Sequence, residues 1–136
     1  MLTLPLWFLL SCHAVHQAAT EEAIAKANIR RAKTLIHHAE KALETYFTDT
    51  SYYPTEAEGG IYALIRAPKP NDQSRPTRWN GPYIVSKTLK DPWGNDLKYE
   101  LVEDEQGRSS RLAVHIWSYG PNGKNDNGEG DDIKNW

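Results

Sequence analysis

Apolar side chains between residues 20 and 47 recur every three or four positions. They are Ala32, Leu35, Ile36, Ala39, Leu43, Tyr46 and Phe47. This spacing places them on one face of an α-helix and predicts a single buried stripe. Thr20 is a suitable N-cap, and the acids Glu21 and Glu22 favour the positive end of the helix dipole. The pattern therefore predicts a helix of roughly 28 residues that begins at Thr20 and ends before Pro54.

Two segments near the C-terminal end alternate between apolar and polar residues, as half-buried strands do. Their apolar positions are Leu97, Tyr99 and Leu101 in the first segment and Leu112, Val114 and Ile116 in the second. The polar link over 103–110 favours an antiparallel hairpin, whose apolar face needs a cover. The long helix is the one predicted element large enough to supply it. The expected fold class is α+β, with a long N-terminal helix packed on a small antiparallel sheet.

Shorter signals fill the region between the helix and the hairpin. Residues 61–65 predict one or two helical turns, residues 67–82 with their four prolines predict an irregular connection, and residues 83–85 predict a short strand. Asp91-Pro92-Trp93-Gly94-Asn95 predicts a turn, because proline sets the first bend and glycine permits a positive φ after it.

The first nineteen residues carry no Asp, Glu, Lys or Arg. The apolar stretch over 2–10 is shorter than the roughly 20 residues that a membrane-spanning helix needs. It has the length of a signal-peptide core but lacks a preceding Lys or Arg. Leu9-Leu10-Ser11-Cys12 resembles a lipoprotein cleavage site in which Cys12 would be lipidated, and the alternative is a plain helix start that packs on the body. We therefore divide the chain into an apolar N-terminal segment, 1–19, and a domain over 20–136.

Composition excludes several classes of protein. The 136 residues include 16 Lys+Arg, 18 Asp+Glu and one cysteine, for a formal net charge of −2, and the mean hydropathy is −0.69. That length suits a single domain. The low hydropathy excludes a multi-span membrane protein, and the near-balanced charge argues against nucleic acid as a partner. A lone cysteine excludes an internal disulfide and a cysteine-rich zinc site.

No constellation of residues predicts catalysis, and we expect the protein not to be an enzyme. His37 and His38 are adjacent on the predicted helix, so their side chains point about 100° apart and cannot share one metal ion. Ser118 does not lie in a Gly-x-Ser-x-Gly nucleophile elbow, and no glycine-rich phosphate loop follows a strand. The seven tyrosines and five tryptophans are expected to cover a thin core.

An acidic, glycine-rich segment follows the second predicted strand. Residues 120–132 contain four carboxylates, three carboxamides and four glycines, with no hydrophobic residue between Tyr119 and Ile133. One interpretation is a disordered polar tail. The other is a loop fixed at both ends, because Ile133 and Trp136 resume apolar character as though the chain docks again. Its repelling carboxylates would then need a cation, and oxygen donors with glycines suit Ca²⁺, which takes about six to eight oxygen ligands.

Known calcium motifs fit this segment poorly. An EF-hand loop starting at Asn122 would put Lys124 at its third position and Asn127 where glycine is required. The same register puts Ile133 where the bidentate glutamate belongs. Residues 128–133 match part of the β-roll nonapeptide pattern, but that pattern binds Ca²⁺ only when it is repeated several times. The residues alone leave the tail and the calcium loop as open alternatives.

A wider set of motifs resembles one protein family. Along the chain these motifs are Ala42-Leu43-Glu44-Thr45-Tyr46-Phe47, Tyr52-Tyr53-Pro54-Thr55, Ala63-Leu64-Ile65 with Ala67-Pro68, Trp79-Asn80-Gly81-Pro82-Tyr83, Lys90-Asp91-Pro92-Trp93-Gly94-Asn95, Tyr99, Ser118-Tyr119-Gly120 and Asp131-Asp132-Ile133-Lys134-Asn135-Trp136. From about residue 20 to residue 136 the chain resembles the major pseudopilin of the type II secretion system, the GspG-like family. The resemblance implies a long helix on an antiparallel sheet. It also implies a non-enzymatic structural subunit of a pseudopilus, for protein secretion across the outer membrane.

The same resemblance implies a Ca²⁺ site in the loop after the last strand. By position, Tyr119 would offer its backbone carbonyl, and Asp131 and Asp132 match the acids that end the family's loop. Asn122 stands where the family usually has an aspartate, so it keeps an oxygen ligand but loses a charge. The segment 125–127 is longer than usual by one residue, which leaves two further candidate ligands. These are Asp126 and Glu129.

The N-terminus departs from that family. Its members begin with a basic leader, a Gly-Phe-Thr-Leu-x-Glu cleavage motif and an apolar anchor helix, and this motif is absent from the sequence. We expect either a start upstream of Met1 or a stand-alone relative. The leading hypothesis is a pseudopilus subunit of the bacterial cell envelope, anchored in the inner membrane and facing the periplasm, that assembles with copies of itself or other secretion subunits. The alternative is an envelope binding module of the same fold, lipid-anchored through Cys12.

Overall fold

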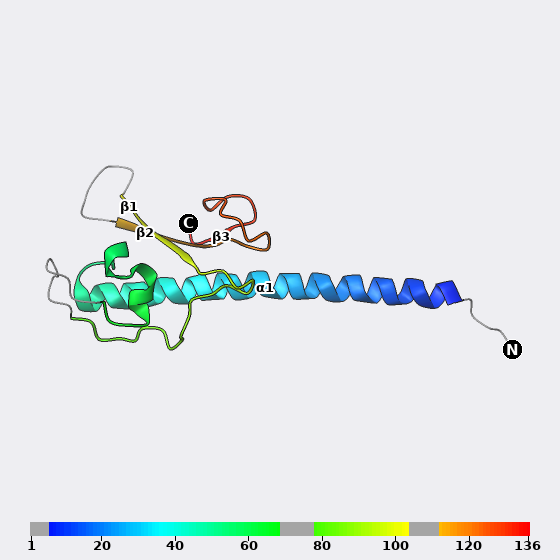
Figure 1. Cartoon of the computed structure of the whole chain (residues 1–136), viewed down its shortest axis with the longest axis horizontal. Helices are drawn as coiled ribbons and strands as arrows, with labels where there is room; N and C mark the ends of the chain where they lie inside the picture. The colour runs from blue at the N-terminus through cyan, green and yellow to red at the C-terminus, as the bar shows by residue number, and fades with distance from the viewer. Residues whose placement is uncertain (1–5, 69–77, 104–111) are drawn as a thin grey trace.

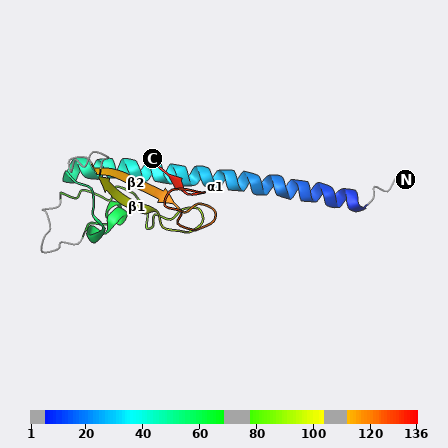
Figure 2. The same cartoon turned by 90° about the horizontal axis from the view of Figure 1, so that it is seen from above.

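The computed structural model of the chain describes residues 6–68, 78–103 and 112–136, and the side chains of 6–13 and of Leu112 stand outside the description. Within these residues, chain order gives the helix α1 (Leu6–Thr50), the short 3₁₀ helices η1 (Glu56–Glu58) and η2 (Gly60–Leu64), and the strands β1 (Lys98–Glu103), β2 (Leu112–Ser118) and β3 (Ile133–Lys134). The sheet lies along one end of α1, while the N-terminal part of the helix extends away from it (Figures 1 and 2). This arrangement confirms the predicted α+β class.

α1 is one unbroken helix of 45 residues, which corresponds to about 67 Å at about 1.5 Å per residue. The predicted start at Thr20 is wrong. The hydroxyl of Thr20 donates to the backbone carbonyl of His16 one turn earlier, at 2.9 Å, so Thr20 lies inside the helix, and the boundary drawn at residue 20 falls within it. The predicted end is confirmed, because α1 stops at Thr50.

The two halves of α1 differ in what they contact. Residues 14–26 are all exposed, whereas the C-terminal half buries most of the predicted stripe against the sheet and η2. Phe47 is an exception and a correction: it is 43% exposed and packs against Tyr53, with ring centroids 4.8 Å apart and planes at 38°. Among the described residues, no helix combines the length and the apolar run that crossing a membrane requires. The buried stripe residues are Ala32, Ile36, Ala39, Leu43 and Tyr46.

In the described part of the chain the sheet has three antiparallel strands in the order β1–β2–β3. Tyr99 pairs with Ile116 in β1 and β2, which confirms the predicted hairpin and places their side chains on one face. β3 adds a strand that the apolar character at Ile133 indicated only as a returning segment. Just beyond it, the side chain of Asn135 accepts from the Ile116 amide at 2.8 Å and donates to Glu40 of α1 at 3.1 Å.

The connection between α1 and the sheet contains both confirmed and wrong predictions. η2 confirms the helical turns expected over 61–65, with Ile61 and Leu64 buried. The strand predicted over 83–85 is wrong, because the amides of Tyr83 and Ile84 both donate to the carbonyl of Leu64, at 2.7 and 3.1 Å, and no ladder forms. The irregular connection predicted over 67–82 and the link over 103–110 fall mostly on 69–77 and 104–110, outside the described residues.

The turn over 91–95 is confirmed. The amide of Gly94 donates to the carbonyl of Asp91 at 3.0 Å, and Gly94 has a φ of 92°, a left-handed conformation that glycine adopts without strain. Lys90 and Asp96 form an isolated antiparallel bridge on either side of the turn. The turn is therefore closed by backbone pairing at its base.

Candidate metal centre

Residues 119–132 form a loop that leaves β2 and returns as β3. These strands are paired neighbours, with Ser118 opposite Ile133, so the chain does dock again, as the second interpretation of the segment expected. Gly120 lets the two ends of the loop touch: its φ is 63°, and a Cβ on it would lie 2.1 Å from the carbonyl oxygen of Asp131. A side chain at this position would force the ends of the loop apart.

Asp126, Asp131 and Asp132 turn toward one another inside this loop. One carboxylate oxygen of each lies within 4.8 Å of the others, and all three residues are half-buried. Carboxylates held this close repel one another, and a cation between them removes the repulsion. These three aspartates can therefore hold a metal ion.

Asp132 is oriented by the backbone of the loop. Its Oδ2 accepts from the amides of Gly128, at 2.8 Å, and Asp126, at 3.1 Å. Its Oδ1 is buried and has no hydrogen-bond partner in the part of the chain that the structure describes. A buried polar atom without a partner costs about 1–3 kcal/mol, and a cation would supply the missing interaction. The donor set consists of oxygens, which is the chemistry of a site for a hard cation.

Asn122 spans the gap between the other two carboxylates. Its Nδ2 donates to Oδ2 of Asp126 at 3.1 Å and to Oδ1 of Asp131. Its backbone amide donates to Oδ2 of Asp131 at 2.9 Å, and its own Oδ1 accepts from the amide of Lys124 at 2.5 Å. The carboxamide thus turns the positive end of its dipole toward the two carboxylates.

The remaining predicted site residues lie outside this cluster. The side chain of Glu129 is 80% exposed and pairs with Nζ of Lys134 at 3.1 Å. The ring of Tyr119 lies beneath the ammonium of Lys98, 5.1 Å from it, and its backbone carbonyl stays a predicted ligand. The side chain of Cys12 falls outside the described residues, and its lipidation stays a prediction.

A buried carboxylate outside the loop anchors the start of the loop. The sequence predicts Asp91 only as part of a turn, yet its Oδ1 accepts from the amides of Trp93 and Asn95, at 3.0 and 2.9 Å. Its Oδ2 accepts the hydroxyl of Ser118 at 2.6 Å, and Oγ of Ser118 accepts from the amide of Gly120 at 3.1 Å. The motifs around Asp91 and Ser118 are both visible in the sequence, but nothing in them indicates that the two residues meet.

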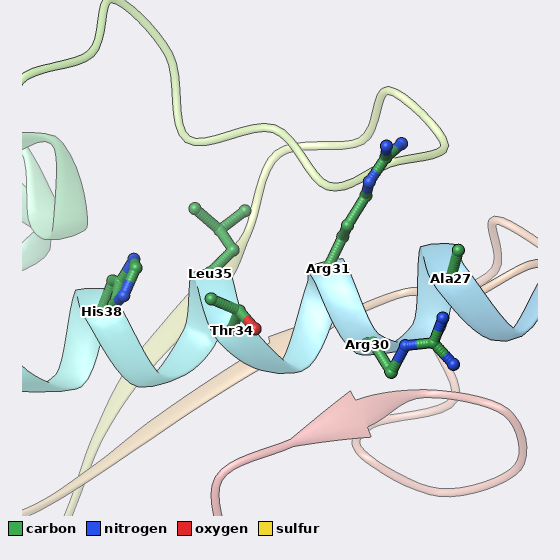
Figure 3. Close-up of a pocket in the computed structure, with 6 residues that line it drawn as sticks. All are labelled: Ala27, Arg30, Arg31, Thr34, Leu35 and His38. Atoms are coloured by element: carbon green, nitrogen blue, oxygen red, sulfur yellow. The ribbon is translucent and has the colours of Figure 1, made fainter.

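A shallow groove on α1 is the other hollow of note (Figure 3). Arg30 and Arg31 diverge from neighbouring positions on the helix, and Arg31 points toward the segment that runs beside α1 (Figure 3). The lining is cationic and apolar without a carboxylate, so the groove is not a second cation site. The residues that line it are Ala27, Arg30, Arg31, Thr34, Leu35 and His38.

The sequence profile of the family described as type II secretion system (T2SS), protein G matches residues 20–136. The chain belongs to this protein G family. Two relatives carry the name type II secretion system core protein G. The protein of Vibrio cholerae serotype O1 is 36% identical over 112 residues, which cover 82% of this chain and 70% of that one. The protein of Dickeya chrysanthemi is 36% identical over 111 residues, which cover 82% and 65%.

A solved structure agrees with the protein G assignment. The crystal structure of the major pseudopilin from the type 2 secretion system of enterohaemorrhagic Escherichia coli matches with a TM-score of 0.60 and 33% sequence identity. The match covers 85% of this chain and 87% of that one. The resemblance to the major pseudopilin family is therefore confirmed, and so is the pseudopilin-like arrangement of helix and sheet.

Proposed function

We propose that this member of the protein G family is a non-enzymatic structural subunit of a type II secretion pseudopilus, and that one Ca²⁺ holds its loop over 119–132. The observation that supports the calcium part is the buried, unpaired Oδ1 of Asp132 beside the carboxylates of Asp126 and Asp131. The names of the relatives support the secretion part.

The proposed ligands are all oxygens. Asp126, Asp131 and Asp132 supply carboxylates, and the carbonyl of Tyr119 supplies a neutral oxygen at the end of β2. Asn122 would join them by turning its carboxamide so that Oδ1, rather than Nδ2, faces the ion. Such a set suits Ca²⁺, which accepts flexible geometry and about six to eight oxygens, better than it suits metals that favour nitrogen or sulfur.

Calcium would act by making the loop part of the folded domain. The loop is tied to the body at both ends, through Gly120 and Ser118 at one side and through β3 at the other. The ion would remove the repulsion that opposes this arrangement. A ligand that binds only the folded form adds about 2.7 kcal/mol of stability at a concentration 100 times its Kd.

The exposed half of α1 supports a role in assembly. Val15 is 71% exposed and Ile24 is 56% exposed, on a segment whose described residues, 14–26, are all open to solvent. These two side chains are nine positions apart and therefore point to roughly opposite sides of the helix, so partners would contact this half of α1 from more than one side. We propose that this half of the helix packs against copies of the chain or other secretion subunits in the cell envelope, and leads toward the inner membrane.

The test of the calcium proposal compares melting temperatures with Ca²⁺ and with a chelator. Chelation is expected to lower the melting temperature of the wild type. Asp131→Ala combined with Asp132→Ala should lower the melting temperature in Ca²⁺ and abolish the difference between the two conditions. Glu129→Ala removes an acid of the same loop outside the cluster and should keep the difference. An unchanged wild-type melting temperature after chelation contradicts the proposal.

The test of the assembly proposal is a pair of substitutions on the exposed half of α1. Val15→Asp with Ile24→Asp should leave the melting temperature of the domain unchanged, because neither side chain is buried. The same variant should lose cross-linking to itself or to other secretion subunits in cells that carry the secretion system. Undiminished cross-linking would remove this surface from the proposal.

A further inference from the structure

We propose that Trp136 is a positioning residue for the metal loop: its indole holds the backbone at Gly128, and Gly128 in turn orients Asp132 toward the ion. This inference rests on the calcium site proposed above and adds to it a residue that contacts no ligand oxygen directly. It concerns the side of the loop that faces the sheet.

The indole of Trp136 is held by groups from two strands. It stacks on the imidazole of His115 in β2, with centroids 4.0 Å apart and planes at 7°, and meets Trp117 edge-on, with centroids 5.8 Å apart. Nζ of Lys134 in β3 lies 4.9 Å from the centroid of the same ring. Stacked and edge-to-face contacts of this kind have defined geometry, so the ring has one orientation relative to the sheet.

The edge of this ring meets the backbone of the loop. Gly128 is buried although its neighbours in sequence are exposed, and a Cβ on it would lie 2.4 Å from Cζ2 of Trp136. Its φ of 81° is also a conformation that favours glycine. The glycine is therefore required twice, by the close approach of the indole and by the direction of the chain.

Gly128 connects the indole to the cluster of aspartates. Its amide donates to Oδ2 of Asp132 at 2.8 Å, which leaves Oδ1 of that carboxylate as the buried atom without a partner. A displacement of the backbone at 128 would therefore turn the carboxylate that the ion needs. Groups that orient a ligand in this way commonly contribute ten- to hundred-fold to metal affinity.

The same aromatic layer holds a second point of the loop. Nε1 of Trp117 donates to Oδ1 of Asn125 at 3.1 Å, and that oxygen also accepts from the amide of Asn127. The loop on either side of Asp126 is thus fixed to indoles. Trp136 nevertheless remains 46% exposed, so its truncation opens no cavity in the core.

The experiment measures the Kd for Ca²⁺ by calorimetry and the melting temperature with Ca²⁺ and with a chelator. Trp136→Ala is expected to weaken Ca²⁺ binding by roughly ten- to hundred-fold, with little change in the melting temperature in chelator. Trp136→Phe keeps a ring that can stack on His115 and should recover part of the affinity. Phe47→Ala is the matched control, because Phe47 is also an exposed aromatic that packs against another ring, that of Tyr53. It should leave the Kd unchanged.

A double-mutant cycle isolates the contact between the ring and the backbone. Gly128→Ala should weaken Ca²⁺ binding in the wild type, because its methyl group displaces the indole. In the Trp136→Ala background the same substitution should cost less, since only the strain of the positive φ and the looser contact with Cδ of Lys134 remain. Strictly additive effects of the two substitutions overturn the proposal.

The outcomes separate this inference from the calcium proposal. Absence of Ca²⁺ binding by the wild type overturns both. Wild-type binding with an unchanged Kd for Trp136→Ala overturns the positioning role alone. A Trp136→Ala variant whose melting temperature falls as far in chelator as in Ca²⁺ also overturns it, because the residue would then support the fold in general.

Discussion

The turn over 91–95 and the loop over 119–132 each enclose a carboxylate, and they differ in how many of its oxygens have a hydrogen-bond partner. Both oxygens of Asp91 are satisfied by donors from the chain, two amides and one hydroxyl. Asp132 has two amides on one oxygen and no partner among the described residues on the other. Protein atoms alone complete the hydrogen bonds of the turn. In the loop, the proposed cation would supply the contact that the described residues leave open at Asp132.

The number of carboxylates explains the difference. The turn carries one buried acid and surrounds it with donors. The loop brings three acids together, and amide donors cannot neutralise that much charge in a half-buried space. We therefore expect the stability contributed by the turn to be independent of calcium and that of the loop to depend on it.

The largest effect on the free energy of unfolding should come from a substitution that breaks the turn. Asp91→Ala leaves the hydroxyl of Ser118 and two backbone amides without their acceptor, and should lower the free energy of unfolding by about 3 kcal/mol. Urea denaturation should show the same loss with Ca²⁺ and with a chelator. Asp91→Asn keeps an acceptor and should lose less. A loss that vanishes in chelator would mean that Asp91 acts through the ion.

A smaller effect should come from restoring an acid in the loop. Asn122→Asp places a fourth carboxylate beside Asp126 and Asp131, and should lower the free energy of unfolding by about 1 kcal/mol in chelator. With Ca²⁺ the added charge should tighten binding by about ten-fold, since ligand charge tunes calcium affinity. Calorimetry measures the change in Ca²⁺ affinity, and melting curves in chelator measure the change in stability. Weaker Ca²⁺ binding would contradict the placement of Asn122 beside the ion.

The smallest effect concerns pH at the base of the turn. The hydroxyl of Tyr62 donates to Asp96 at 2.5 Å, and with Lys90 at 3.2 Å it lowers the pKa of Asp96 below its usual value. A lowered folded-state pKa contributes stability that is present above the unfolded pKa and is lost as the pH falls through the folded pKa. Because the side chain is 47% exposed, the contribution should be about 0.3 kcal/mol.

Asp96→Asn should flatten the loss of stability at acidic pH by that amount, measured by urea denaturation in chelator across the acid range. Tyr62→Phe removes the main cause of the shift and should act in the same direction. An acid-range slope identical in all three proteins would show that Asp96 does not support the turn.

Long periodic patterns predicted most of this fold. The buried stripe from Ala32 to Tyr46 and the hairpin of β1 and β2 follow from spacing alone, because each buries one face of a regular element. The start of α1 did not follow, since threonine bonds a carbonyl within a helix as readily as it caps one. The strand over 83–85 failed because its two amides meet a single carbonyl at Leu64, a tertiary contact that local sequence does not contain.

The sequence predicted which segment holds the candidate site more fully than it predicted how the side chains of the site are arranged. Composition and the resemblance together located Asp131 and Asp132 and named Asp126 and Glu129 as further candidates. The structure brings Asp126 together with the two aspartates and leaves Glu129 exposed beside Lys134. Separation in sequence hid the supports of the site: Asp91 reaches Ser118 across 27 positions, and Trp136 reaches His115 across the sheet. The first contact depends on how the turn over 91–95 packs against β2. The second depends on how β3 pairs with β2, and a two-residue strand is too short to show a pattern in the sequence.

Asn135 gives the loop a reporter of its own. Its side chain accepts the amide of Ile116 and reaches Glu40 on the helix, so the end of the loop, the central strand and α1 meet at one carboxamide. The amide proton of Ile116 can exchange with solvent only when its hydrogen bond to that carboxamide breaks. The exchange rate of this one proton therefore measures how often the end of the loop opens. If an added cation slows the exchange, the ion stabilises the closed form of the loop.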